Sequence, residues 1–463
     1  MNSIYELISA ISKRSEEKTI IRYIESGQVK EISNKQFLTD IGYCCEYLKD
    51  YWNGETKGKH IVLLAPSSYE YIVVMLSCGL LGSVIIPVNN TESRETIEKI
   101  IKFSDADLVI DNPQNFVKQN KESILDTGEF KKNLKDEFSC LLFTSGTCGK
   151  PKGVMLSQKN ILSSALSIDN VFDSISNIRP DIEFSNCFIM LPFYHSFGLA
   201  LLYAALIGEV VVDVCSDLRM FYRDLSLYNS EIIACPPIAV NLLTADILRG
   251  KIESWGTRIK FVISGSAPLS PEVINVLKAK GLFIALGYGM TETAGAGTLN
   301  ISCDNPFSVG RSSDKTDIEI RDGEIFLKND SVMLGYYKDE EETKNVLKDG
   351  WIATGDLGSL DDNGYLYITG RKKNLIILSS GENISPEEIE QKLLTNKDIL
   401  EVVVKEEEQK ICAEIFCDPS KEKEIIEQIK IYNSTVPMYK RITKYVFRSK
   451  PFEKTNSGKI LRK

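Results

Sequence analysis

Histidine is scarce in this chain of 463 residues, which contains only His60 and His195. Its eleven cysteines include no CxxC pair, and most of them stand singly among apolar residues. Zinc sites of ordinary spacing need clustered cysteines and histidines, so the sequence argues against one. A disulfide scaffold is also disfavoured, and we expect free buried thiols of the kind kept in a reducing cytoplasm.

An excess of basic residues is missing as well. Lys and Arg number 55 against 64 Asp and Glu, which gives a net charge of −9 at pH 7. A dedicated nucleic-acid-binding protein shows the opposite balance, so we expect no nucleic-acid partner. The first residues lack the basic stretch and apolar core of a secretory signal, which favours a cytoplasmic location.

One apolar run has the length of a membrane-span candidate. Residues 71–88 are eighteen positions without a charge. Gly79 and Gly82 divide the run into a helix-like half and a short β-branched half. We therefore predict a buried helix followed by a buried strand, and no integral membrane association.

Short apolar runs alternate with helix-length segments through the first two-thirds of the chain. The expected strands are 60–65, 83–88, 106–111, 139–144, 187–192, 210–215, 231–236, 259–264 and 282–287, with helices such as 92–103 and 271–280 between them. This alternation predicts an α/β fold with doubly wound parallel sheets. Nine strands favour two sheets over one.

The pattern changes after about Arg311. Asp322-Gly323 and Asn363-Gly364 each lie between alternating segments, which predicts antiparallel hairpins. From Arg371 to the end follows a charged segment whose length suits a small α+β domain.

A glycine-rich stretch follows the predicted strand 139–144. It runs from Ser145 to Gly153 and interleaves hydroxyls, glycines and lysines, which together bind anions through backbone N–H groups and positive charge. It is not a Walker A loop, because Pro151 stands where that motif has its second glycine. In isolation such a stretch also fits a mobile surface loop, but its place after a buried strand favours phosphate binding.

A second candidate site is ALGYGMTETAG, residues 285–295. The dinucleotide fingerprint GxGxxG fails here, because Glu292 occupies its last position. Tyr288 offers an aromatic face for a flat base, Thr291 a hydroxyl, and Glu292 a carboxylate suited to Mg²⁺ on a phosphate. The alternative is a turn followed by a helix that Thr291 caps.

Together with residues 323–337, 350–358, 364–390 and 451–460, these stretches resemble the adenylate-forming (AMP-binding) superfamily of acyl-CoA synthetases, luciferases and non-ribosomal-peptide adenylation domains. The resemblance runs from about residue 60 to the end, in the family's order. It implies a large N-terminal domain, residues 1–370, of two doubly wound sheets plus a small β-barrel-like subdomain. A small mobile α+β domain, residues 371–463, follows, with Lys373 at the hinge.

The resemblance also assigns residues to ATP and Mg²⁺. The phosphates would contact Thr144, Ser145, Gly146, Thr147, Gly149, Lys150 and Lys152. The adenine would lie between Gly265, Ser266, Ala267 and Pro268 on one side and Tyr288 on the other, and Gly287 and Gly289 also belong to the cofactor site. The ribose would bind Asp356, with Arg371 beside it. Thr291 would contact the α-phosphate, and Glu292 would help to hold Mg²⁺. Lys459 would bridge the substrate carboxylate and the α-phosphate, where positive charge stabilises the transition state. By charge counting alone, Lys459 is one more solvated cation near the chain's end.

Two half-reactions are implied by the same resemblance. The small domain would rotate after adenylation, withdraw Lys459 and bring the loop with Gly381, Glu382 and Asn383 into the site. The chain departs from the family pattern at Cys148, where a Thr or Ser is usual, and at Asn374, which replaces an acidic residue. A thiol is a weak donor, so the grip on phosphate would rest more on Ser145, Thr147 and backbone amides.

His195 lies in LPFYHSFGLA, which resembles the segment before the family's acyl pocket. There it would gate or contact the substrate or assist the second half-reaction, whereas a lone histidine elsewhere is usually structural. No acidic residue occurs between Leu191 and Leu202 to pair with an amino-acid ammonium, so a fatty or aromatic acid is favoured. The pocket lining would include Ala234, Pro236, Gly265 and Gly287.

The sequence therefore predicts an ATP-dependent carboxylate–CoA ligase, an acid–thiol ligase of fatty-acid metabolism whose small-molecule partners are a carboxylic acid and CoA. The first alternative is an adenylation enzyme that loads an acyl or aminoacyl group onto the phosphopantetheine of a carrier protein. The second is a catalytically silent nucleotide-binding homologue. The presence of Glu292, Asp356, Arg371 and Lys459 together counts against that last reading.

Overall fold

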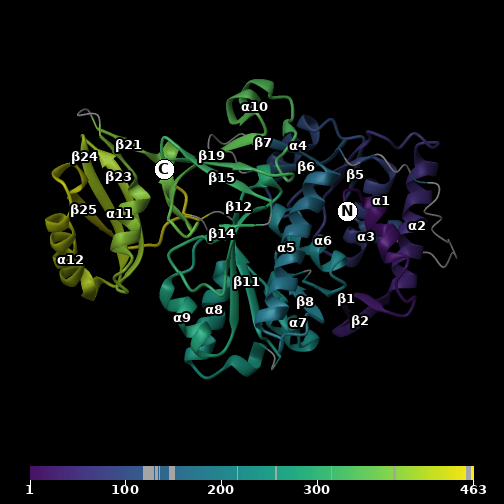
Figure 1. Cartoon of the computed structure of the whole chain (residues 1–463), viewed down its shortest axis with the longest axis horizontal. Helices are drawn as coiled ribbons and strands as arrows, with labels where there is room; N and C mark the ends of the chain where they lie inside the picture. The colour runs from purple at the N-terminus through teal and green to yellow at the C-terminus, as the bar shows by residue number, and fades with distance from the viewer. Residues whose placement is uncertain are drawn as a thin grey trace. The chain divides into compact units, whose positions relative to one another are not determined.

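The computed structural model describes residues 1–117, 130, 134, 136–144, 152–215, 217–255, 258–313, 315–378, 382–454 and 460–462 (Figure 1). Its internal contacts divide the chain into two compact units. The first contains Met1–Asp317 and Lys328–Ile352, and the second contains Ile318–Leu327 and Ala353–Lys463. The predicted domain boundary at 370/371 and the hinge at Lys373 stay predictions.

A nine-stranded sheet forms one half of the first unit, in the order β14-β13-β12-β11-β10-β8-β9-β1-β2. Its strands are β1 (Thr19–Glu25), β2 (Gln28–Ser33), β8 (Asn186–Ile189), β9 (Val211–Val214), β10 (Ile232–Ala234), β11 (Phe261–Gly265), β12 (Phe283–Gly289), β13 (Gly297–Ile301) and β14 (Arg311–Ser312). The strands from β12 to β1 run parallel, and β2, β13 and β14 are antiparallel additions at the two edges. Buried parallel strands of this kind read as apolar runs in the sequence.

A six-stranded sheet forms the other half, in the order β17-β7-β6-β4-β3-β5. Its strands are β3 (His60–Leu63), β4 (Val84–Pro87), β5 (Leu108–Ile110), β6 (Phe138–Thr144), β7 (Lys152–Ser157) and β17 (Gly335–Tyr336). Each of the nine predicted strands coincides with a strand of one of these two sheets. The prediction of an α/β fold with more than one sheet is therefore confirmed.

Helices cover both sheets of the first unit. They are α1 (Ile4–Ile11), α2 (Asn34–Tyr51), α3 (Tyr69–Leu81), α4 (Arg94–Phe103), α5 (Gln158–Ile178), α6 (Ser196–Ile207), α7 (Phe221–Tyr228), α8 (Pro237–Leu248), α9 (Pro271–Ala279) and α10 (Glu340–Val346). The helix α5 contacts β6 and β7, α6 contacts β8 and β9, and the two helices pack on each other between the sheets.

The uncharged run of residues 71–88 forms the buried helix α3 followed by β4, as predicted. Within the described ranges, no helix combines the length and the apolar character that crossing a membrane requires. The cysteines in those ranges are all buried free thiols.

The antiparallel region forms a five-stranded sheet of β15 (Asp317–Arg321), β16 (Glu324–Lys328), β19 (Trp351–Leu360), β18 (Leu347–Lys348) and β20 (Leu366–Arg371). It lies where the β-barrel-like subdomain was predicted. Asp322 and Gly323 both have positive φ, 51° and 78°, as a two-residue hairpin turn of type I′ requires.

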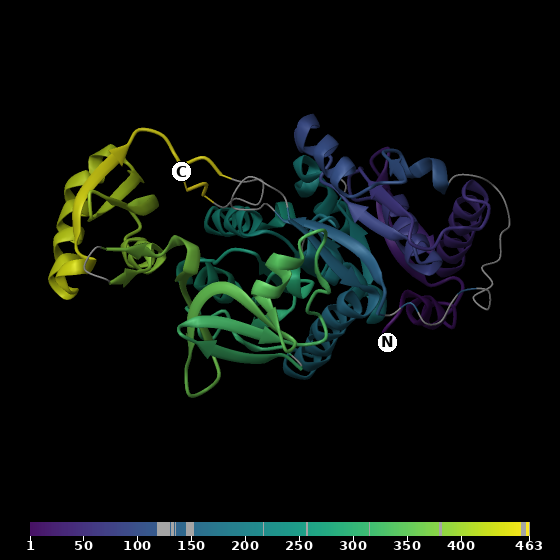
Figure 2. The ribbon, with the colours of Figure 1, turned by 90° about the horizontal axis from the view of Figure 1, so that it is seen from above.

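The second unit ends in a small α+β fold. A three-stranded sheet contains β23 (Ile399–Glu407), β24 (Lys410–Cys417) and β25 (Ile442–Arg448), preceded by the short strands β21 (Ile376–Ile377) and β22 (Asn383–Ile384). The helices α11 (Pro386–Leu393) and α12 (Glu422–Thr435) pack against this sheet and against each other (Figure 2). Ile389, Ile415 and Ile429 belong to their common core.

Candidate active site

The predicted phosphate-binding stretch connects two paired strands. β6 and β7 are antiparallel, and Thr144 lies directly opposite Lys152. The strand β7 was not predicted, because its glycine and lysine conceal the apolar positions that follow. The predicted phosphate ligands between these two ends lie outside the described residues: Ser145, Gly146, Thr147, Gly149 and Lys150, together with Cys148.

Lys152 is the first residue of β7, and its side chain contacts two residues far along the chain, Tyr336 of β17 and Glu342 of α10. Its ammonium lies 2.5 Å from a carboxylate oxygen of Glu342 and 4.9 Å from the ring centroid of Tyr336. The hydrogen bond from Lys152 lowers the pKa of Glu342 below its ordinary value. A cation held over an aromatic face in this way is restrained in position without being neutralised by the ring.

Glu292 is buried in the 3₁₀ turn η5 (Thr291–Thr293), which follows β12. Its Oε1 accepts a hydrogen bond of 2.8 Å from the hydroxyl of Tyr336. Burial and the neighbouring charge of Glu292 raise the pKa of Tyr336, which keeps the hydroxyl protonated as a donor. Tyr336 therefore links two predicted site residues, Glu292 through its hydroxyl and Lys152 through its ring.

Strand pairing fixes the place of Tyr336. β17 adds to the edge of the six-stranded sheet, with Tyr336 opposite Val154 and Gly335 opposite Met155. The backbone N–H of Met333 donates to the carbonyl of Glu292 at 2.8 Å. The segment 333–336 thus joins the Glu292 turn to the strand that begins at Lys152.

The predicted adenine segments meet at the carboxyl ends of β11 and β12. The two strands are parallel with Gly265 opposite Gly287, which is the end of a parallel sheet where ligands bind. A Cβ on Gly265 would lie 2.9 Å from the carbonyl of Gly287 and 2.9 Å from the ring of Phe197. Only glycine fits this approach, after which Ser266 is exposed with a φ of 70° and Ala267 is half-buried.

Tyr288 and Gly289 continue β12 and pair with β13. Both are half-buried, as is Thr291 at the start of η5. The turn is closed by Thr293, whose Oγ1 accepts a hydrogen bond of 3.3 Å from the N–H of Met290. The alternative reading of Thr291 as the capping residue is therefore wrong, while its contact with an α-phosphate stays a prediction.

His195 lies at the N-cap position of α6 and is exposed. Its ring centroid is 4.7 Å from that of Tyr194. Two residues further on, Phe197 places its ring against Gly265 and Gly287. The His195 segment and the predicted adenine segments therefore lie at the same end of the nine-stranded sheet. The sequence analysis missed Phe197, although its aromatic side chain stands within the quoted motif.

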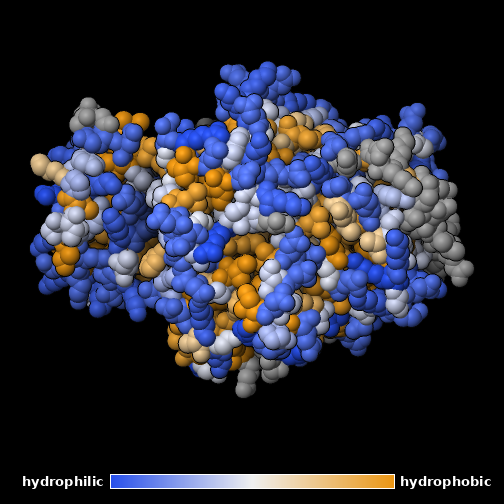
Figure 3. All heavy atoms as spheres, viewed as in Figure 1, coloured by the Kyte–Doolittle hydropathy of each residue, from blue (hydrophilic) through white to orange (hydrophobic). Residues whose placement is uncertain are grey.

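Residues predicted to line the acyl pocket lie on or directly after β10, in the same sheet. Ala234 is the buried last residue of β10, and Pro236 directly precedes α8. On α8, Ile238 is 64% and Leu242 42% exposed. Hydrophobic residues also gather on the face over β11 that Figure 3 shows, bordered by hydrophilic ones.

Asp356 and Arg371 meet in the second unit. They are direct partners in the antiparallel pair β19–β20, and Nε of Arg371 lies 2.6 Å from Oδ1 of Asp356. The Asp356 side chain is 5% exposed and that of Arg371 43%. The N–H of Asp356 also donates to Oγ1 of Thr354 at 3.0 Å. One edge of the carboxylate is therefore held by a cation that still reaches solvent.

The predicted hinge residue Lys373 is the middle residue of η6 (Lys372–Asn374), directly after β20. The neighbouring Asn374 donates from its amide to Oε1 of Glu387 at 2.6 Å. An acidic residue at position 374 would meet that carboxylate with like charge. Gly381 and Lys459 lie outside the described residues, and Glu382 and Asn383 lead into β22.

Residues 9–337 match the family model of the AMP-binding enzymes. The chain belongs to this family. It is 28% identical to a 2-succinylbenzoate–CoA ligase of Bacillus cytotoxicus over 75% of each chain, and 26% identical to the long-chain-fatty-acid–CoA ligase FadD13 of Mycobacterium tuberculosis over 88% of each. The resemblance seen in the sequence is confirmed.

The solved structures agree on the fold. The AMP complex of O-succinylbenzoate coenzyme A synthetase (MenE) from Bacillus subtilis superposes with a TM-score of 0.81 at 22% identity. The match covers 98% of this chain and 97% of that one. The mixed α/β arrangement of several sheets is therefore that of an AMP-binding enzyme.

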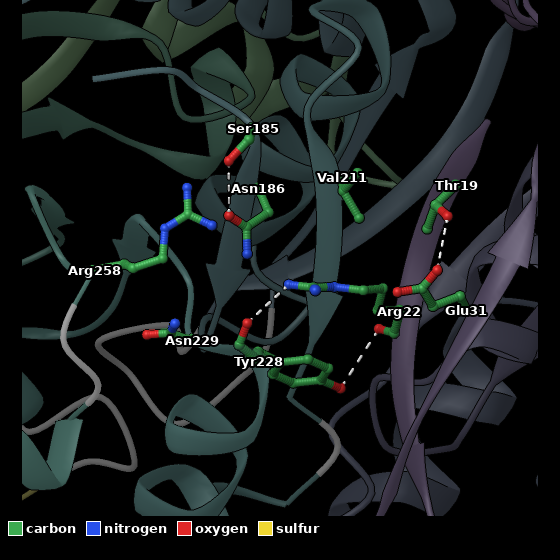
Figure 4. A pocket seen from close by; sticks show the side chains of 9 residues that line it. All are labelled: Thr19, Arg22, Glu31, Ser185, Asn186, Val211, Tyr228, Asn229 and Arg258. Carbon is green, nitrogen blue, oxygen red and sulfur yellow. Dashed lines mark hydrogen bonds between the residues drawn. The ribbon is translucent and has the colours of Figure 1, made fainter. Parts of the chain in front are cut away.

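This AMP-binding enzyme contains a cavity of about 260 Å³ (Figure 4), and none of the predicted site residues is among the residues that line it. Its lining includes Asn186 and Val211, the first residues of β8 and β9, and so it lies at the amino ends of these parallel strands. Arg22 lines it too and is paired with the buried Asp213 at 2.6 Å. Because Asp213 already compensates the charge of Arg22, we do not assign a ligand to this cavity.

Proposed function

We propose that this AMP-binding enzyme is an ATP-dependent carboxylate–CoA ligase, which forms an acyl-AMP with release of pyrophosphate and then a thioester. The observation that carries the proposal is the linked group of Lys152, Tyr336 and Glu292 at the paired ends of β6 and β7. It joins a cation suited to phosphate oxygens with a carboxylate suited to Mg²⁺. The names of both reported relatives, which are CoA ligases, support the same activity.

The residues present fit a magnesium–ATP complex. Mg²⁺ takes oxygen ligands and is commonly bound by one or two carboxylates together with substrate phosphates. Glu292 offers a buried carboxylate of which one oxygen accepts from Tyr336. When bound, the ion supplies positive charge at the phosphate oxygens. Tyr336 orients Glu292 toward that role, and Lys152 of β7 would exchange its partner Glu342 for a phosphate oxygen when ATP binds.

Adenylation needs little covalent chemistry from the protein, because the acid's own carboxylate is the nucleophile. Positioned positive charge and alignment of the reactants carry most of the rate. In the proposed mechanism Asp356 accepts hydrogen bonds from the ribose hydroxyls, with Arg371 fixing its orientation. Lys459 bridges the acid and the α-phosphate, and Thr291 contacts the same phosphate.

A fatty or aromatic acid is the proposed substrate class. The reported relatives are named for a succinylbenzoate and for long-chain fatty acids. No acidic residue occurs between Leu191 and Leu202, so an amino-acid ammonium finds no partner there. The exposed apolar side chains of α8 offer a surface for an apolar acid. CoA is the proposed acceptor, since both relatives are named for it.

Pyrophosphate exchange tests the first half-reaction. The wild-type protein is assayed with ATP, Mg²⁺ and short, medium, long and aromatic acids, followed by transfer to free CoA with the best acid. We expect acid-dependent exchange and thioester formation on CoA, and loss of exchange in Lys459→Ala with ATP binding retained.

Two outcomes separate the alternatives. Exchange without transfer to CoA, but with transfer to a pantetheinylated carrier protein, would establish the carrier-loading enzyme. Binding of ATP with no exchange for any acid would establish a silent homologue. Wild-type exchange in Lys459→Ala would show that the lysine assignment is wrong.

A further inference from the structure

Two short segments near the end of the chain lie side by side in the second unit. We call residues 452–454 the first arm and residues 460–462 the second arm. Lys454 and Ile460 pair through an isolated antiparallel bridge, and the N–H of Leu461 donates to the carbonyl of Glu453 at 2.8 Å. Lys459 directly precedes Ile460 in the sequence. The anchoring of both arms therefore fixes where the connection that bears Lys459 begins and ends.

Glu401 of β23 holds the first arm. Its Oε2 accepts from the N–H of Phe452 at 2.7 Å, and its Oε1 lies 2.6 Å from the ammonium of Lys454. The side chain of Glu401 is only 12% exposed. One carboxylate with little exposure thus fixes the backbone and a side chain of the same arm.

Arg462 holds the second arm through a separate carboxylate. Its guanidinium donates to Oε2 of Glu390 on α11 and to the carbonyl of Val404 on β23, the latter at 3.3 Å. The other oxygen of Glu390 accepts from the N–H of Val404 at 2.6 Å. Glu387 lies 3.4 Å from the same guanidinium. Arg462 is therefore fixed to a helix and a strand at once.

Burial of the Glu390 carboxylate costs free energy of folding. The Glu390 side chain is 9% exposed, and a carboxylate taken out of water destabilises a fold unless it is paired and hydrogen-bonded. An apolar residue at position 390 would pack into the neighbouring core at less cost. The pair of Glu390 and Arg462 therefore lowers the stability of the fold but fixes the position of the second arm.

We propose that Glu390 and Arg462 are positioning residues that hold Lys459 in place for adenylation. The inference rests on the proposed function, in which Lys459 serves that half-reaction and not the transfer to thiol. Two residues, Ile460 and Leu461, lie between Lys459 and Arg462, so at most about 11 Å of extended chain separates the two positions. We therefore expect release of Arg462 to impair the placement of Lys459, and a misplacement of about 1 Å can cost on the order of 100-fold in rate.

The test measures the two half-reactions separately. Arg462→Gln and Glu390→Gln are assayed for acid-dependent pyrophosphate exchange, and for thioester formation from supplied acyl-AMP and CoA. We expect kcat for exchange to fall on the order of 10- to 100-fold, with transfer from acyl-AMP close to wild type. Arg462→Lys keeps one charged donor and should show a smaller loss in the same half-reaction.

Lys392→Gln is the matched control. Lys392 also pairs with a carboxylate of α11, Glu388 at 3.2 Å, and no contact between it and either arm is described. We expect both half-reactions of this variant to equal those of the wild type. A loss comparable to that of Arg462→Gln would mean that any change on α11 has this effect, and would overturn the proposal.

The remaining outcomes distinguish failure of the positioning role from failure of the proposed function. Parallel loss of both half-reactions with a lowered Tm would show that Glu390 and Arg462 are merely structural. Wild-type exchange in Arg462→Gln, with exchange lost in Lys459→Ala, would overturn the positioning role and leave the proposed function intact. Wild-type exchange in Lys459→Ala would refute the lysine assignment and the inference together. If Arg462→Gln does not fold, the same comparison is made with Arg462→Lys.

Discussion

Tyr336 is the residue on which the observed site geometry depends most. It contributes a hydroxyl to Glu292 and a ring face to Lys152, yet it carries no charge and is not one of the residues that the sequence predicted. Its partner Glu292 is 44 positions away along the chain. A contact of that separation leaves no periodic signal, so sequence patterns alone could not reveal it.

Tyr336→Phe removes the hydroxyl and keeps the ring. A hydrogen bond to a charged group contributes about 1.5–3 kcal/mol, so we expect exchange to fall about tenfold or more and the Mg²⁺ concentration for half-maximal activity to rise. Magnesium titrations of pyrophosphate exchange measure both quantities. Tyr337→Phe is the control, because the Tyr337 hydroxyl donates to the exposed Asp105 at 2.8 Å. An unchanged magnesium requirement in Tyr336→Phe would contradict the role of Tyr336.

We expect Glu390 to give the enzyme a pH dependence. Burial raises the pKa of Glu390 from 4.5 to about 7, with a smaller contribution from Glu387, and Arg462 opposes the rise. A carboxyl whose pKa is higher in the folded chain stabilises the fold most below pH 4.5, and this contribution is lost as the pH rises through about 7. The free energy of unfolding of wild type, relative to that of Glu390→Gln, should therefore decrease over that interval in urea titrations.

Activity should move in the opposite direction to stability. The carboxylate that holds Arg462 forms as the pH rises through about 7, so we expect exchange to rise over the same interval. Glu390→Gln should lack this limb of the pH profile. A limb of equal size in the variant would assign it to another group.

At the scale of elements, an ion pair joins the N-terminal hairpin β1–β2 to the other strands of the nine-stranded sheet. Arg22 of β1 and Asp213 of β9 are register partners, with Nε 2.6 Å from Oδ1. Asp213 is fully buried and also accepts from Asn186 and Ser230. The attachment of β1 thus depends on a carboxylate that needs its cation.

Arg22→Met leaves that carboxylate buried without its cation. Breaking a buried pair costs about 3–5 kcal/mol, and we expect the free energy of unfolding to drop by that amount in urea titrations. Arg94→Gln serves as the comparison, since Arg94 and Glu98 form an exposed pair on α4 whose loss should cost less than about 1 kcal/mol. Equal costs in the two variants would contradict the special status of Arg22.

Local sequence predicted the buried strands well, because each reads as an uninterrupted apolar run. It missed β1 and β2, whose mixed polar residues flank Ser26-Gly27, although that dipeptide is a turn signal. The order of the strands could not be predicted from local sequence, because partners such as β1 and β9 lie far apart along the chain. For the site, resemblance to a family placed Asp356 beside Arg371, as the structure has them.

For the whole molecule, the two proposed half-reactions make the predicted rotation about Lys373 the feature to test. Proline fixes φ and also restricts the residue before it, so Lys373→Pro should hinder that rotation. We expect thioester formation to fall on the order of tenfold or more, with pyrophosphate exchange largely retained. Rapid-quench measurement of each half-reaction gives the two rates. Equal loss in both would argue against a hinge at this position.

The chain passes between its two compact units three times, after Asp317, Leu327 and Ile352. The hairpin segment Ile318–Leu327 contributes the carbonyls that accept from Thr354 and Gly358. A single nick by a protease therefore cannot liberate the smaller body intact. A gene fragment that starts at Ala353 would lack its own acceptors, so any split version of this enzyme must carry residues 318–327 into the C-terminal piece.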